Sequence, residues 1–356
     1  MVDDHDVGAF LRSVMGPPPW TPDSIAWGPG EVTVGGWAIP SPAPAFALNG
    51  RPFDSAETAL DRDDIGQLFW FVPEARRSGF VCRCDLRADD VSLDCVRFDY
   101  VDGRTGEPFT DAHSVFHPSR SADYPPLPDG PRRRRVHGAE NGDAFVLEGF
   151  SSFVKMGRIL ERTVGKSYAD FTNILDWGCG CGRFARYFAP VAPPGYVGVD
   201  IDADNAAWCA ANLPFGRFLH VPFHPPTPLE SASFDLLIGI SVFTHLTESD
   251  QDEWLAELQR ISSPSAILLM TVHGPSSVCR SGLSPEQVLE WRDAGFVDSG
   301  RNADLDEVLG ESEAYRNVFH THDYVRRRWA RWFDVLEIVP GTIGNHQDVV
   351  VMRPLA

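Results

Sequence analysis

The sequence lacks long apolar runs and has little positive charge. No stretch of its 356 residues approaches the ~20 consecutive apolar residues that a helix needs to cross a bilayer. Residues 1–6 are acidic, unlike the basic start of a signal peptide, so we expect a cytoplasmic protein with no membrane span. The net charge of −19 argues against nucleic acid as a partner, because phosphate binding requires a basic surface.

The sequence also lacks the spacing of a metal site. It contains no Cys-x2-Cys pair followed by a second pair at zinc spacing, and Cys82 and Cys84 are expected to be buried free thiols on one face of a strand. Asp202, Asp204 and Asn205 lie close together, but they open a probable helix and are typical capping residues. We predict no bound metal.

The first part of the chain, residues 1–125, is rich in proline and glycine and has short runs of alternating apolar residues. Asn49-Gly50 is a strong hairpin signal. The pattern predicts a small β-sandwich-like N-terminal domain. Its expected strands are residues 31–39, 44–48, 79–86 and 91–100, with a short helix at 55–60.

A proline-rich linker is predicted from residue 117 to about residue 135, where it ends in four consecutive arginines, Arg132 to Arg135. These arginines could meet a phosphate or carboxylate of a ligand. The alternative is a solvated surface run, which is what such charge runs usually are.

From residue 136 to residue 356, strands alternate with helices, which predicts parallel βαβ units in a doubly wound α/β sheet. The last two strands follow each other directly and should therefore be antiparallel. The expected strands are residues 173–177, 196–201, 217–221, 234–240, 266–272, 334–339 and 348–352, and the expected helices are 151–164, 183–188, 204–212 and 248–261.

A glycine-rich turn follows the first of these strands, with Gly178, Gly180 and Gly182 at every second position. Glycine allows a tight turn and lets a ligand lie against the main chain, next to the N–H groups of the following helix. The spacing differs from the dinucleotide pattern G-x-G-x-x-G, and Asp176 would repel a pyrophosphate but suit an amino group. The next strand ends in Asp200, a typical acceptor for ribose hydroxyls.

Together with residues 234–246, these motifs resemble the class I S-adenosylmethionine-dependent methyltransferases. The segments ILDWGCGCGR, SVFTHL and NHQDVVVMR are similar to bacterial members found in glycan and natural-product biosynthesis. The resemblance covers residues 135–353 and implies a Rossmann-like sheet with an antiparallel C-terminal strand pair. It implies an enzyme that uses S-adenosyl-L-methionine to methylate a small polar acceptor, with O-methylation of a sugar or secondary metabolite as the expected reaction.

The resemblance also implies which residues bind the cofactor. Asp176, Gly178 and Gly180 would meet its methionine end, and Gly182 would allow the following helix to pack closely. Asp200 would meet the ribose and Ile201 the adenine, while Ile240 and Ser241 would line the mouth of the site. The full set is Asp176, Gly178, Cys179, Gly180, Gly182, Asp200, Ile201, Ile240 and Ser241. The acid that the family usually places near the adenine amino group is missing from residues 220–226, so backbone groups, His220 or His224 would replace it.

A hydroxyl acceptor would require a general base, and histidine suits that role near neutral pH. His245 and His273 follow strands at the sheet edge where α/β proteins bind ligands, so we predict them as catalytic. Each could instead be structural, as could His346 in the last hairpin. Residues 275–324 could form a cap over the acceptor.

Alternatives remain open at this point. The enzyme could methylate nitrogen or carbon, or the fold could belong to an NAD-type oxidoreductase or to a non-catalytic carbohydrate-binding module. The N-terminal sandwich could recognise a small-molecule or glycan acceptor, or could form a homodimer.

Overall fold

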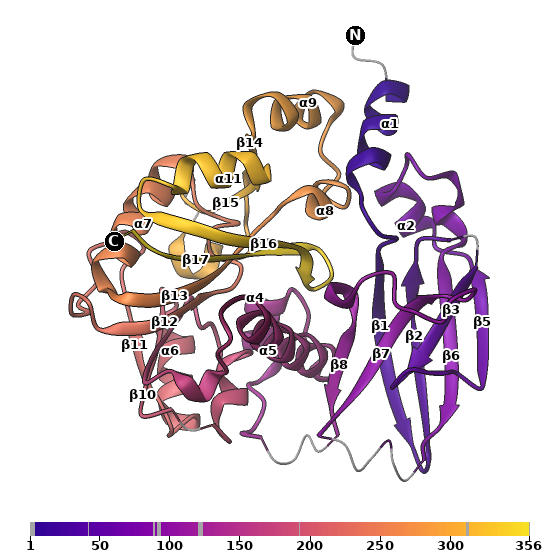
Figure 1. The fold of residues 1–356 in the computed structure, drawn as a ribbon, viewed down its shortest axis with the longest axis horizontal. Helices are drawn as coiled ribbons and strands as arrows, with labels where there is room; N and C mark the ends of the chain where they lie inside the picture. The colour runs from indigo at the N-terminus through magenta and orange to yellow at the C-terminus, as the bar shows by residue number, and fades with distance from the viewer. Residues whose placement is uncertain are drawn as a thin grey trace.

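The computed structural model describes residues 4–41, 43–87, 90, 94–119, 124–191, 193–310 and 313–355. Figure 1 shows an N-terminal pair of β-sheets and a larger mixed sheet, with the long helix α5 (Gly142–Val164) between them. Helix α5 contacts strands of both parts. Among the described residues, no helix is long and apolar enough to cross a membrane.

The N-terminal sheets are antiparallel and four-stranded, as a β-sandwich requires. Alternating residues of both sheets, such as Val34, Phe80 and Phe98, share one hydrophobic core. One sheet has the order β1 (Trp20–Gly28), β2 (Glu31–Ala38), β6 (Gly79–Asp85) and β5 (Ser55–Leu60), and the other has the order β4 (Arg51–Pro52), β3 (Pro44–Leu48), β7 (Cys95–Asp102) and β8 (Val115–Pro118).

Three expectations for this part need correction. Residues 55–60 form strand β5 rather than a helix, because the edge of β6 is free to pair with them, with Ala56 opposite Cys82. The strand expected at 91–100 is described only from Cys95, since residues 91–93 lie outside the described residues. The end of the predicted linker is helix α4 (Gly130–His137), which Asp129 caps at its start and Gly138 at its end.

The mixed sheet has seven strands in the order β11-β10-β9-β12-β13-β17-β16. The first five are parallel, and β17 runs antiparallel to both β13 and β16. The predicted fold class is therefore confirmed. The strands are β9 (Asn173–Trp177), β10 (Gly195–Asp200), β11 (Arg217–His220), β12 (Phe234–Gly239), β13 (Ser262–Val272), β16 (Phe333–Ile343) and β17 (Gln347–Pro354).

Both faces of this sheet are covered, which explains its almost continuously apolar strands. Leu175 and Leu237 face a core that includes α7 (Glu248–Ile261) and α11 (His322–Trp329), whereas Ile174 and Leu236 face a core that includes α5. Helix α6 (Ala203–Asn212) packs beside β10 and β11. The helix expected at 183–188 is only a short 3-10 turn, η5 (Ala185–Phe188).

The segment after β13 folds into small elements that meet the N-terminus of the chain. It contains α8 (Pro275–Val278), α9 (Pro285–Ala294), β14 (Phe296–Arg301), α10 (Asp306–Leu309) and β15 (Arg316–His320), and β14 pairs antiparallel with β15. Helix α1 (Asp4–Val14) lies beside α9 in Figure 1, and Val7 and Leu11 share a core with Val288 and Trp291. Helix α2 (Asp63–Leu68) supplies Ile65 to the same core.

Candidate functional site

The glycine-rich turn after β9 wraps the end of the neighbouring strand β10. Gly178, Gly180 and Gly182 have φ angles of 75°, 52° and 78°, the left-handed region that glycine tolerates best. The N–H groups of Gly178 and the following residue donate to the carbonyl of Val199 at 2.9 and 3.0 Å, and that of Gly180 donates to Asp200 Oδ2 at 2.6 Å. Asp200 therefore fixes the turn in addition to any contact with a ligand.

All three glycines also lie too close to neighbours for a side chain, since a Cβ on Gly180 would approach Val136 to 2.9 Å. A Cβ on Gly178 would approach Val242 to 2.4 Å, and one on Gly182 would approach Leu213 to 2.7 Å. Gly182 therefore faces α6 rather than the turn's outer side, whereas the sequence predicted close packing with the helix that follows it.

A cavity opens over the turn and contains about 1000 Å³ of empty space, open solvent included. Eight of the nine predicted cofactor residues line it together, Gly182 being the exception. These eight are Asp176, Gly178, Cys179, Gly180, Asp200, Ile201, Ile240 and Ser241. We call this space the first cavity.

Two buried acids give the first cavity its electrostatic character. Asp176 is 2% exposed and accepts a hydrogen bond from the Tyr196 hydroxyl at 2.8 Å, and burial raises its pKa to about 7. Burial also raises the pKa of Asp200 to about 6, although this carboxylate accepts N–H groups from Gly180 and Asp202. Neither acid has a cationic side chain within 4.0 Å among the described residues. The pair therefore suits a ligand that brings an ammonium group and hydroxyl donors.

Part of the cavity wall comes from residues that the motifs did not indicate. Leu305 and Tyr315 reach it from the segment after β13, and Phe223 and Trp254 reach it from beyond β11 and from α7. Each is apolar or aromatic and lies far in sequence from the glycine turn, so no local signal distinguished it from core residues.

Helix α4 supplies another part of this wall, through Arg135 and the next residue. Arg135 binds Asp202 and Asp204 at 2.9 Å each, and Arg132 binds Asp204 at 2.6 Å. Arg134 instead pairs with Glu140 at the surface. Two of the four arginines thus attach α4 to the start of α6. Their ion pairs are within the protein, so these two arginines match neither the ligand contact nor the solvated surface run considered above.

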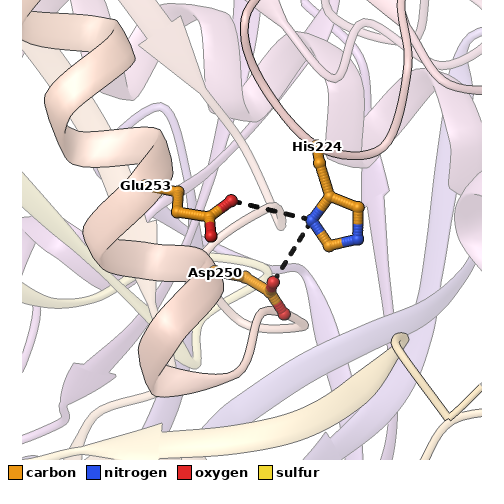
Figure 2. A group of neighbouring side chains, drawn as sticks. All are labelled: His224, Asp250 and Glu253. Carbon is orange, nitrogen blue, oxygen red and sulfur yellow. Dashed lines mark ion pairs between the residues drawn. The ribbon is translucent and has the colours of Figure 1, made fainter.

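On the side predicted for adenine, neither His220 nor His224 lines the first cavity. Figure 2 shows His224 turned toward two acids of α7, with Nδ1 3.4 Å from Asp250 and 3.8 Å from Glu253. These three side chains could in principle ligate a metal, but His224 and Glu253 are more than half exposed and form ordinary surface ion pairs.

Asp202, one of the three residues considered above as possible metal ligands, caps a helix, as the sequence predicts. Asp202 is the N-cap of α6 and accepts the N–H groups of Asp204 and Asn205 at 3.0 and 3.1 Å.

The predicted catalytic residues His245 and His273 belong to a row of aromatic rings that leads away from the first cavity. Tyr315 lines the cavity and stacks on His245 with 4.4 Å between ring centroids. His245 and His273 are 6.0 Å apart, and His273 and His346 are 6.2 Å apart. The structure thus brings the histidines together but places neither His245 nor His273 on the cavity wall.

All three histidines are held in the same way. Nδ1 of His245, His273 and His346 lies 2.8, 3.2 and 3.0 Å from a main-chain carbonyl oxygen. Because a carbonyl can only accept, we infer that each Nδ1 carries the hydrogen and each Nε2 can accept a proton. Burial lowers the pKa of His245 and of His346 to about 4, and that of His273 below its ordinary value, so all three are neutral at pH 7.

Comparison with known proteins bears on this site. Residues 174–265, from β9 into β13, match a family model described as a methyltransferase domain. This match and the sheet order favour a methyltransferase over the NAD-type oxidoreductase and the non-catalytic module, and they confirm S-adenosylmethionine as the predicted cofactor.

Solved structures show distant similarity. One is 1,6-didemethyltoxoflavin-N1-methyltransferase of Burkholderia thailandensis, with 17% identity and a TM-score of 0.43 over 65% of this chain and 92% of that chain. The N-methyltransferase NodS of Bradyrhizobium japonicum has 12% identity and a TM-score of 0.41 over 64% of this chain and 100% of its own. The PH0226 protein of Pyrococcus horikoshii has 17% identity and a TM-score of 0.39 over 58% and 91%.

Proposed function

Because this chain carries a class I S-adenosylmethionine-dependent methyltransferase domain, we propose that it methylates an oxygen atom of a small polar acceptor, such as a sugar or a secondary metabolite. The gathering of the glycine turn, Asp176 and Asp200 around the first cavity supports the cofactor part of the proposal, and His346 on the wall of a second cavity supports oxygen as the acceptor atom. When bound, S-adenosylmethionine supplies an electrophilic methyl group, and the protein supplies position and electrostatics.

Different residues of the first cavity would orient different parts of the cofactor. The buried carboxylate of Asp176 would hold the ammonium group, and Asp200 would accept the ribose hydroxyls. Ile201 and Phe223 would pack against the adenine face. Because neither His220 nor His224 lines the first cavity, backbone groups would bind the adenine amino group. Orientation of this kind contributes about 7–11 kcal/mol to a bimolecular reaction.

A hydroxyl acceptor must also lose a proton, and His346 is the histidine best placed to take it. It lies on the wall of a second cavity, whereas His245 and His273 line neither cavity. The adjacent Gln347 donates to Ser241 Oγ at 2.8 Å, so the turn that carries His346 is fixed beside the predicted mouth of the cofactor site. We propose that His346 Nε2 accepts the proton. His245 and His273, which precede His346 in the row of aromatic rings, would position its ring.

The test is transfer of labelled methyl groups from S-adenosylmethionine to paired hydroxyl and amine acceptors. We expect transfer to hydroxyls, and we expect His346→Asn to lower kcat about 100-fold with little change in KM for the cofactor, because a general base contributes roughly 10²–10⁴-fold. His224→Asn, at the surface, is the control and should leave kcat unchanged. Transfer only to amines or carbon nucleophiles, or an unchanged kcat for His346→Asn, would contradict the proposal.

A further inference from the structure

A second cavity lies between the N-terminal sandwich and the methyltransferase domain. Its walls come from β1 and β8, from α5, from Arg280 after α8, and from the turn between β16 and β17 at residues 344–346. It contains about 830 Å³ of empty space, open solvent included. It borders the first cavity through Glu148 on α5, whose Oε1 lies 2.5 Å from the guanidinium of Arg183 in the first cavity.

The charged groups around the second cavity are unevenly paired. Both carboxylates on its wall already have arginine partners: Asp23 pairs with Arg62 at 2.6 Å, and Glu148 pairs with Arg183. Of the cations on the wall, Lys155 and Arg280 have no carboxylate oxygen within 4.0 Å among the described residues. The cavity therefore carries uncompensated positive charge in a protein whose net charge is −19.

Lys155 is fixed at the floor of the cavity and is only 5% exposed. Its Nζ donates to the carbonyl of Thr342 at 2.8 Å and to Asn345 Oδ1 at 2.7 Å. An ammonium group has three donors, so one remains for a ligand. Burial lowers the pKa of Lys155 to about 7, although the charges of Glu148 and Asp99 act in the opposite direction.

Arg280 is oriented by the sandwich but is weakly bonded. Its guanidinium lies over the ring of Trp37, 4.9 Å from the centroid. Its hydrogen bonds to Gly344, Asn345 and Thr21 measure 3.3–3.5 Å, longer than the usual 2.7–3.2 Å. A guanidinium that is held flat with unused donors matches the fork geometry that carboxylates bind best.

We propose that the second cavity binds the methyl acceptor and that this acceptor carries a carboxylate, bound by Arg280 and Lys155, on a small apolar body. Pro22, Val115 and Leu147 provide the apolar wall, and His346 faces the same space. The carboxylate would anchor one end of the acceptor, so that its reactive end lies toward His346 and the cofactor. This proposal rests on the proposed function, because it supposes that methyl transfer takes place between the two cavities.

The test uses protein saturated with S-adenosylhomocysteine and three probes: benzoate, benzamide and inorganic phosphate. Calorimetry or NMR titration should show benzoate binding at least about 10-fold more tightly than benzamide, since they share a shape and differ in charge. Arg280→Met should remove this preference. Arg292→Met is the matched control, because Arg292 also lies over an aromatic ring, Phe10, but at the surface and outside the cavity.

Ala144→Phe is a second variant that narrows the cavity without changing its charge, and it should also weaken benzoate binding, so the test does not depend on the folding of Arg280→Met. Equal affinity for benzoate and benzamide, or no benzoate binding up to about 10 mM, would overturn the proposal. Tighter binding of phosphate than of benzoate would also overturn it. S-adenosylhomocysteine binding in the same samples separates the two claims: if it persists while benzoate fails, only the carboxylate proposal falls.

Discussion

At the scale of single residues, the two buried acids of the first cavity combine a structural cost with a binding function. Asp176 lies in the sheet core with a hydroxyl as its hydrogen-bonding partner, and burial raises its pKa from 3.8 to about 7. Its protonated form therefore stabilises the fold, and this contribution is fully present below pH 3.8 and is lost as the pH rises through 7. A bound ammonium group would reverse the effect by stabilising the carboxylate.

This argument predicts opposite effects of Asp176→Asn on folding and on binding. The amide is neutral and can still accept the Tyr196 hydroxyl, so without ligand the stability of the variant relative to the wild type should increase by about 3 kcal/mol between pH 5 and pH 8. Urea denaturation at the two pH values measures this change. Affinity for S-adenosylhomocysteine at pH 8 should fall at least about 10-fold, because the charge-assisted bond is lost.

A stability difference between variant and wild type that does not change with pH would show that Asp176 does not titrate in this range. Unchanged affinity for S-adenosylhomocysteine would show that the ammonium group binds elsewhere.

At the scale of elements, helix α4 forms part of the wall of the first cavity and is attached to the start of α6 by two of its four arginines. Arg135 pairs with the buried Asp202, and removing one partner of a buried pair leaves an uncompensated charge. Arg135→Met should therefore loosen the wall and weaken S-adenosylhomocysteine binding about 10-fold. Arg134→Met, in the same helix, should change the affinity less than about twofold, because Arg134 is exposed and pairs with Glu140 at the surface.

Calorimetric titration of the two variants measures the difference. Equal effects would indicate that the arginine run acts through general charge, whereas no effect of Arg135→Met would mean that α4 does not contribute to the bound state.

The elements that the sequence predicts well are those with strong local patterns. The parallel strands and the Asp202 cap are where apolar runs and capping residues place them. Strand β5 and helix α4 were missed because their sequences carry no apolar period: β5 is specified by the edge of β6, and α4 by acids about 70 residues further along the chain. The same reason applies to the site residues. A local motif predicts the glycine turn and Asp200, whereas only the tertiary fold brings Tyr315 and Arg280 to the cavities.

At the scale of the whole molecule, we propose that residues 1–125 and 136–356 are two domains that unfold together. Val7 and Leu11 of α1 share a core with Trp291 of α9. Asn345, in the last hairpin, donates to the carbonyls of Trp20 and His113 in the sandwich at 3.1 and 3.2 Å. The second cavity lies at this junction, so the position of its charged groups depends on both domains.

Calorimetry of the full chain should therefore show one unfolding transition, with equal calorimetric and van't Hoff enthalpies. Asn345→Ala should lower the temperature of that transition without splitting it, because two buried carbonyls lose a donor. Two separate transitions in the wild type would contradict the shared-core argument.

The central claim is that the first cavity binds S-adenosylmethionine through Asp200 and the glycine turn. Its most direct test is calorimetric titration with S-adenosylhomocysteine and, separately, with NADH. The account predicts micromolar binding of the first and none of the second, a loss of about 100-fold in Asp200→Ala, and no change in Asp293→Ala, whose exposed side chain pairs with Arg292 and does not line the first cavity. Binding of NADH, or equal affinity in wild type and Asp200→Ala, would contradict it.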